Sequence, residues 1–266
     1  MSDPQPANPV SRLKSLPPFQ FLLTLGGPIV IAVVCWIYLA VMMADMSAIP
    51  GMSSMMMMKQ PLSHPGYLFG LFIMWAIMMA AMMVPTAGTM ITAYARMRSA
   101  DRQESGRSLS VLVFASGYVA TWAAYSVGAT VLQAVLTELA YLSPMMMKIV
   151  PGPLAAGVLI TAGIYQLMPL KQRCLHQCRT PIAFLMTEWR EGDWGAFVMG
   201  WRHGVYCVGC CWALMGLLFV VGVMNIYWII AIMIYVLIEK VVPFSPIVSR
   251  LVGAGMIGMG LWMITA

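Results

Sequence analysis

The stretch YLFGLFIMWAIMMAAMMVPTAGTMITAY, residues 67–94, decides the fold class. It holds no charged residue and exceeds the roughly 20 residues that a helix needs to cross a membrane. Its apolar residues run continuously instead of alternating, which favours a helix over a barrel strand. Such runs recur along the 266-residue chain, whose mean hydropathy is +0.84. The sequence therefore predicts an all-α, polytopic transmembrane helical bundle.

We expect about seven spans in one helical transmembrane domain over residues 19–266. Their predicted bounds are 19–43, 67–94, 109–134, 151–170, 207–224, 226–242 and 251–266. Asn225 alone separates the fifth span from the sixth, so six spans are the alternative, with these two as one broken helix. Residues 1–18 are polar and proline-rich and are expected to form a disordered tail. The run from Phe19 is expected to stay as the first span and not to be removed as a signal.

Basic residues set the expected orientation. With the N-terminus inside, outer segments contain only Lys59 and Lys148, and the other thirteen of the 15 Lys and Arg residues lie in inner segments. The net charge of +6 then indicates contact with anionic lipid heads and not with nucleic acid. The inner segment 171–206 is expected to be a cytoplasmic loop, in which EWREGDWG, residues 188–195, forms an interfacial helix.

Five of the six cysteines gather near this inner segment. On a helix, a histidine and three cysteines of HGVYCVGCCW, residues 203–212, fall within one arc of about 100°. Two more cysteines, in CLHQC at 174–178, also share a helix face. Thiols in a reducing compartment stay free, and such a set suits Zn(II) or Cu(I). The alternative is that buried cysteines act as small hydrophobic residues. The expected ligands are His203, Cys207, Cys210, Cys211, Cys174 and Cys178.

Methionines form a second pattern, with 28 in the chain. Runs lie in both expected outer loops, and thioether sulfur favours Cu(I). Within 67–94 a ladder at i, i+4 and i+8, together with the carbonyl that Pro85 frees at Ala81, could form an ion path. The alternatives are flexible apolar filler in the loops and a tightly packed Met/Ala helix. The candidates in the span are the ladder residues Met74, Met78 and Met82. Those in the first outer loop are Met55, Met56, Met57 and Met58, where Asp45 and His64 could join a Cu(II) or Zn(II) site. The run in the second outer loop is Met145, Met146 and Met147.

Few charged residues lie at membrane depth, where a carboxylate is costly. Glu239 is followed directly by Lys240 near the inner end of the sixth expected span. We therefore expect these two neighbours to form an interfacial ion pair. The alternative is a functional role for Glu239, because intramembrane carboxylates often have one.

Three segments together resemble a bacterial family described as predicted metal-binding integral membrane proteins. They are MWAIMMAAMMVPT at 74–86, YQLMPLKQRCLHQCRTP at 165–181 and GWRHGVYCVGCCWALMGLLFVVGVMN at 200–225, and the EK pair at 239–240 fits as well. The resemblance extends from about residue 67 to the end of the chain. It implies a helical fold in the bacterial inner membrane and suspected metal binding, without a known reaction.

These patterns favour a transition-metal-binding membrane protein. Cu(I), with Zn(II) as the alternative, would be held or passed between the outer Met-rich loops and the inner Cys/His cluster. A structural or assembly subunit of a larger membrane complex is a second hypothesis. A membrane thiol oxidoreductase using Cys207 and Cys210 is a third, because CxxC spacing suits redox thiols. No catalytic signature favours an enzyme. The expected partners are the lipid bilayer, other membrane subunits and a metallochaperone.

Overall fold

The computed structural model describes residues 18–48, 65–99, 107–143, 147–149, 152–242 and 245–265. In these ranges the regular secondary structure is helical except for two short antiparallel strands, β1 (Leu142–Ser143) and β2 (Lys148–Ile149), and short turns join the elements. The helical fold class is therefore confirmed. Several predictions lie outside the described residues: the tail up to residue 17 and the candidates Met55, Met56, Met57, Met58, His64, Met145 and Met146.

Proline begins many of the helices. α2 (Pro18–Ala48), α4 (Pro65–Ser99), α6 (Pro153–Leu167), α7 (Pro169–Arg179) and α8 (Pro181–Glu188) all start at one. Proline suits the first helical position because an N–H there would have no partner within the helix. The other helices are α5 (Arg107–Glu138), α9 (Gly192–Gly216), α10 (Leu218–Val221), α11 (Ile226–Val241) and α12 (Ser245–Thr265).

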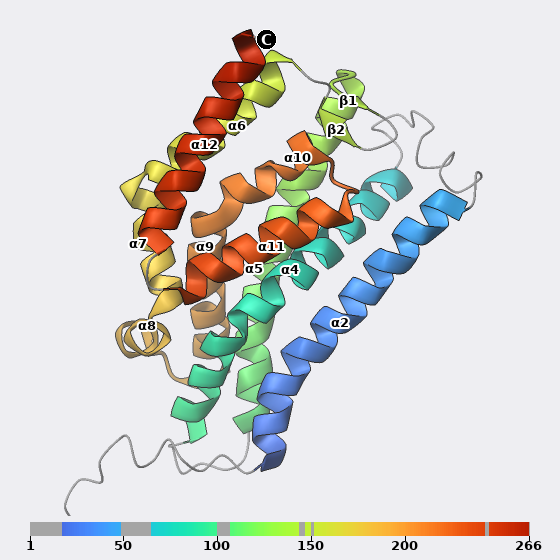
Figure 1. Cartoon of the computed structure of the whole chain (residues 1–266). Coiled ribbons are helices and arrows are strands. Elements are labelled where there is room, and N and C mark those ends of the chain that lie inside the picture. Colours follow the sequence, from blue (N-terminus) through green and yellow to red (C-terminus); the bar gives the residue numbers. More distant parts are fainter. Residues whose placement is uncertain are drawn as a thin grey trace, which may run out of the picture.

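The helices pack largely in pairs (Figure 1). α2 lies along α4, α5 packs on α9, and α6 packs on α12. α11 crosses the bundle and touches α4, α7, α9 and α12. Because of this crossing, side chains on opposite sides of α11 reach different helix pairs.

The prediction of about seven spans is not confirmed. Among the described residues, four helical stretches are long and apolar enough to cross a membrane: Pro65–Arg98, Leu109–Glu138, Gly192–Val221 and Pro246–Thr265. A fifth results if α6 and α7, which are bent by 64°, form one broken span. Within the predicted span 19–43, the apolar helical stretch among the described residues is Gly26–Met42. The predicted span 226–242 corresponds to α11, which has 16 residues.

The segment 171–206 differs from the expected loop because most of it is helical. α7 and α8 occupy its first half, and α9 begins at Gly192. EWREGDWG is therefore the junction between α8 and α9 and does not form a helix of its own. Trp194 is exposed, whereas the ring of Trp189 packs against Tyr94 with centroids 5.9 Å apart. This early start of α9 places Cys207 inside a long buried helix.

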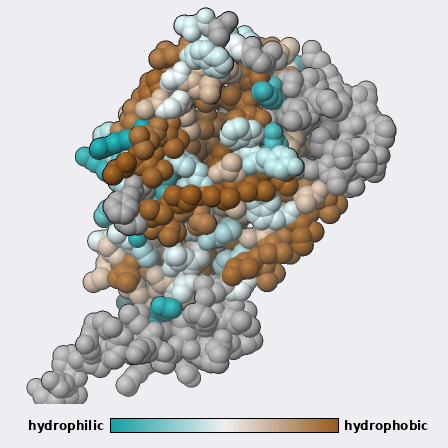
Figure 2. Space-filling model, viewed as in Figure 1, coloured by the Kyte–Doolittle hydropathy of each residue, from teal (hydrophilic) through white to brown (hydrophobic). Residues whose placement is uncertain are grey.

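Large apolar side chains cover much of the outer surface (Figure 2). They include Ile29, Val34 and Ile37 on α2 and Leu251 and Trp262 on α12, each more than half exposed. Soluble monomers rarely expose apolar surface of this extent. The surface is compatible with membrane insertion, as are the long apolar helices.

Pro85 lies inside α4, which continues through it to Ser99. The proline removes the helical donor for the carbonyl of Ala81. The indole Nε1 of Trp36, on α2, donates to that carbonyl over 3.2 Å. The freed carbonyl thus ties α2 to α4, and this bond does not support the predicted ion path through it.

Glycines let α5 and α9 approach backbone to backbone. A Cβ added at Gly200 would lie 1.9 Å from the carbonyl oxygen of Phe114, and one at Gly117 would lie 2.2 Å from that of Phe197. The hydroxyl of Thr121 bridges the same contact by donating to the carbonyl of Trp201 over 3.1 Å. This close crossing brings Tyr118 on α5 against the thiols of α9.

Gly200→Ala is expected to lower the free energy of unfolding by about 1–3 kcal/mol, because the new methyl group would clash with backbone. Thermal unfolding of the detergent-purified protein measures this effect. Gly128→Ala, in α5, is the matched control because a Cβ there meets nothing within 4 Å. It is expected to be neutral or stabilising by up to about 1 kcal/mol, from helix propensity. Equal melting temperatures for the two variants would contradict the close crossing.

Candidate metal centre

Cys207 lies at the centre of a buried polar cluster. Its thiol is 3.1 Å from the hydroxyl of Tyr118 on α5 and accepts a hydrogen bond from the ammonium of Lys240 on α11, also over 3.1 Å. Lys240 donates in addition to the hydroxyl of Thr86 on α4, over 2.7 Å. Side chains of α5 and α11 therefore contact this thiol of α9, and Lys240 connects it to Thr86 of α4. Lys240 thus places a positively charged group beside the sulfur of Cys207.

Three further thiols surround Cys207. Those of Cys210 and Cys211 lie on the next turn of α9 and donate to the carbonyl oxygen of Cys207 over 3.0 and 2.9 Å. That of Cys178, on α7, is within hydrogen-bonding reach of Cys207 and Cys210. All four cysteines are buried. The predicted cluster is thus assembled by two helices that are distant in sequence.

The α7 helix presents Cys178 because its buried face follows helical spacing. Lys171, Leu175 and Cys178, at i, i+4 and i+7, are its buried residues. Packing of this face against α9 brings the thiol to the cluster. Cys174 shares this side of α7 but is only partly buried. Its sulfur would lie 2.9 Å from a Cβ added at Gly209.

His203 precedes Cys207 by one turn of α9 and is buried. Its ring stacks on that of Tyr118, with centroids 5.5 Å apart, and meets Phe184 edge-on at 5.6 Å. Its Nδ1 is buried without a hydrogen-bond partner among the described residues. An unpaired buried nitrogen is costly, so this atom is available to a ligand or to a rotated side chain.

The expected ion pair between Glu239 and Lys240 is corrected by the structure. Consecutive residues on a helix point about 100° apart. Glu239 pairs instead with Lys171 of α7, while Lys240 points to Cys207 and Thr86. The carboxylate also accepts from Tyr235 over 2.7 Å and from Ser249 of α12 over 2.5 Å. Glu239 thus connects α11 to α7 and α12, and Lys240 connects it to α4 and α9. These contacts on two sides of α11 fix the position of the Lys240 ammonium.

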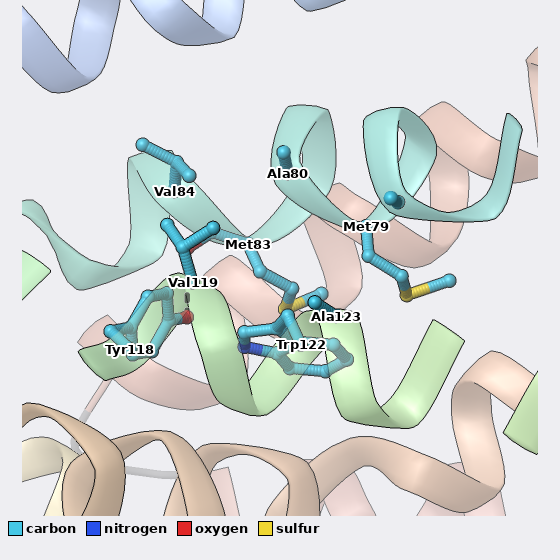
Figure 3. A pocket seen from close by; sticks show the side chains of 9 residues that line it. Met79, Ala80, Met83, Val84, Tyr118, Val119, Trp122 and Ala123 are labelled. Carbon is cyan, nitrogen blue, oxygen red and sulfur yellow. Dashed lines mark hydrogen bonds between the residues drawn. The ribbon is translucent and has the colours of Figure 1, made fainter. Parts of the chain in front are cut away.

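The predicted methionine ladder of Met74, Met78 and Met82 is buried in the helix core. The methionines beside the cluster belong to a neighbouring row. Met79 and Met83 line a small cavity of about 30 Å³ between α4 and α5, together with Tyr118 and Trp122 (Figure 3). The hydroxyl of Tyr118 donates to the carbonyl of Met83 over 3.1 Å. That cavity has room for about one water molecule.

Met147 is the one described residue of its run, and it is buried. Its sulfur accepts a hydrogen bond from the amide of Gln133 over 3.0 Å. The same amide accepts from the indole of Trp75 over 2.5 Å. This contact joins the strand pair to α4 and α5, at a distance from the cysteines.

The cysteine cluster is gathered, but it is not arranged as a finished metal site. In the described ranges, no three His, Cys, Asp or Glu side chains form a group that could hold an ion. Cys210 and Cys211 instead direct their thiols at a carbonyl of the preceding turn. Soft sulfur donors of this kind suit Cu(I) or Zn(II).

Lys240, Tyr118 and Thr86 were not identified as site residues from the sequence. Lys240 could have been singled out as a cation at membrane depth. The adjacent Glu239 suggested an ion pair instead of a contact with the thiols. Tyr118 and Thr86 carried no signal, because tyrosine and threonine occur in many apolar helices. Only helix packing brings them to the cluster.

The long apolar helices and the buried thiol cluster define the class of protein. It is an apolar helical bundle with a candidate site for a soft metal ion. A family model described as "PpoB2: Copper chaperone" matches residues 72–263. The chain therefore belongs to the PpoB2 copper chaperone family, and its function is copper-related. The matched region contains all the residues of the cluster. Comparisons with curated proteins and with solved structures found no match.

Proposed function

We propose that the protein is a membrane-embedded chaperone that holds Cu(I) as cargo at Cys207, Cys210, Cys211 and Cys178. The observation that carries the proposal is the meeting of four buried thiols from α7 and α9 beside one ammonium group. Thiolates are preferred Cu(I) ligands, and family membership supports copper as the metal. Copper is the cargo in this proposal and not a resident cofactor.

Charge balance favours Cu(I) over Zn(II). A Cu(I) ion held by two thiolates carries one net negative charge, which Lys240 at 3.1 Å from Cys207 would neutralise. A Zn(II) ion held by four thiolates would carry two net negative charges. Lys240 would neutralise one of them, and the other would have no counter-charge. Buried charge without a partner is strongly disfavoured. His203 would supply a neutral nitrogen and leave this balance unchanged.

We propose further that methionines capture Cu(I) and pass it to the thiols. Soft thioethers of Met55, Met56, Met57 and Met58 would capture Cu(I) on the outer side, and the Met-rich α4 would pass it to the thiols. Thioethers suit an oxidising compartment because they form no disulfides. Met79 and Met83, which line the cavity beside Tyr118, are better placed for this step than Met74, Met78 and Met82. The bacterial inner membrane is the proposed location.

Metal content tests the thiol site. Full-length protein, purified in detergent and loaded with Cu(I) without oxygen, is expected to hold about one copper per chain by mass spectrometry, as a single site requires. The triple variant Cys207→Ser, Cys210→Ser and Cys211→Ser is expected to lose it. Cys35→Ser is the matched control, because Cys35 lies on α2 away from the cluster. Equal copper in the triple variant and wild type would refute the site.

The same preparation separates the other two hypotheses. A stable co-purifying membrane subunit, with no copper in this chain after loading, would favour an assembly role. A reversible disulfide between Cys207 and Cys210, detected by alkylation before and after mild oxidant, would favour a thiol oxidoreductase.

A further inference from the structure

A pocket of about 700 Å³ lies beside α7 and is bordered by Tyr206 of α9. Arg173, Cys174, His176 and Tyr206 are among the residues that line it. Cys178, Cys207, Cys210 and Cys211 are buried, whereas Cys174 is partly exposed. Cys174 is therefore the member of the α7–α9 group of cysteines that a molecule in the pocket can reach.

Cys174 also contacts the helix that carries the buried cluster. Its sulfur lies against Gly209, where an added Cβ would be only 2.9 Å away. Gly209 directly precedes Cys210, and Cys174 and Cys210 are close enough to interact electrostatically. One turn further along α7, Cys178 reaches both Cys207 and Cys210. Cys174 thus lies between the pocket and α9, and the absence of a side chain at Gly209 makes room for its sulfur atom.

We propose that Cys174 is the port through which Cu(I) passes between the pocket and the buried thiols; this inference rests on the proposed copper function. The step is a ligand exchange without electron transfer. A Cu–S bond forms to Cys174 as a Cu–S bond to the carrier breaks, and the thiol proton of Cys174 moves to the released carrier thiolate. Two further exchanges of the same kind complete the transfer. In the first, the thiol of Cys210 displaces the second carrier thiolate, which takes the thiol proton of Cys210 and leaves as a thiol. In the second, the thiol of Cys178 displaces the sulfur of Cys174, which takes the thiol proton of Cys178.

The pocket favours an anionic carrier. Arg173 contributes a positive charge, and none of the residues that line the pocket is acidic. A Cu(I) ion bound by two thiolates has one net negative charge and fits this lining. We therefore assign the pocket to a Cu(I) thiolate complex and not to the free cation.

Exchange kinetics test the port. Full-length protein is loaded with the Cu(I)–glutathione complex under argon, and bathocuproine disulfonate then removes the ion while absorbance records the rate. Cys174→Ser is expected to keep the wild-type copper content but to slow both loading and removal by about tenfold or more, a barrier change of about 1.4 kcal/mol. Cys178→Ser, at a residue of the buried cluster, is expected to lower the content itself. Cys35→Ser is the control for loss of any thiol.

A second variant tests the same contact without removing a sulfur atom. Gly209→Ala places a methyl group against the sulfur of Cys174. It is expected to slow both the loading and the removal of copper, as Cys174→Ser does. Two results for Cys174→Ser would refute the proposed role of Cys174 as the entry point for copper. One is loading and removal at wild-type rates, and the other is loss of the bound copper from a folded protein. If wild-type protein takes up no copper at all, the proposed function itself fails, which is a separate result.

Discussion

Lys240→Met is expected to weaken Cu(I) binding by about 2–5 kcal/mol, which is roughly 30-fold to several thousandfold in Kd. The ammonium lies 3.1 Å from the sulfur of Cys207. Without it, the negative charge of a Cu(I) dithiolate would be buried with no counter-charge. The hydroxyls of Tyr118 and Thr86 would remain near the site but carry no charge. Competition titration against a Cu(I) chelator of known affinity measures the change.

Two controls isolate the charge of Lys240. Lys240→Arg keeps the positive charge and is expected to retain most of the affinity. Lys148→Met removes an exposed lysine on β2 and is expected to leave Kd unchanged. A folded Lys240→Met protein with a Kd within about threefold of wild type, well under 1 kcal/mol, would show that the ammonium does not stabilise bound copper.

Lys171→Met is expected to lower the free energy of unfolding by about 3–5 kcal/mol, because it leaves the carboxylate of Glu239 buried without a cation. Both side chains are almost fully buried, at 0% and 2% exposure. Glu239 also accepts from Tyr235 and Ser249, so the pair ties α7, α11 and α12 together. Unfolding of the purified protein by denaturant in mixed micelles measures the change.

The double variant Lys171→Met with Glu239→Gln removes both charges and keeps an acceptor for Tyr235 and Ser249. It is expected to be more stable than Lys171→Met alone, as double-mutant cycles show for coupled buried groups. Arg202→Met is the matched control, because the Arg202–Glu188 pair is 42% and 20% exposed. It is expected to change stability by less than about 1 kcal/mol. Equal effects of Lys171→Met and Arg202→Met would refute a structural role for the buried pair.

The helical class and the cysteine cluster were predictable because both depend on short-range pattern. Continuous apolar runs such as 67–94 indicate helices wherever they pack. The spacing of His203, Cys207, Cys210 and Cys211 places them on one helix face with no knowledge of the fold. The structure confirms that this side of α9 is buried. That these residues bind a metal remains a proposal.

The bounds of the spans were not predictable from hydropathy, because apolar runs do not define helix ends. The run 226–242 is as apolar as the others, yet α11 is a short helix that crosses the bundle. Residues 192–206 contain glycines and tryptophans and were expected in a loop, yet they begin α9. The close fit of Gly200 against Phe114 provides the burial that makes them part of a long helix.

By itself, the sequence determined which residue types are present for soft-metal chemistry and which of them share a helix face. The tertiary structure decided which faces meet. Helix packing brought Cys178 close to Cys207 and placed Tyr118 and Thr86 near the thiols. It also gave the side chains of Glu239 and Lys240 different partners. The physical reason is that neighbours along a helix point in directions about 100° apart, so their partners depend on how distant helices pack.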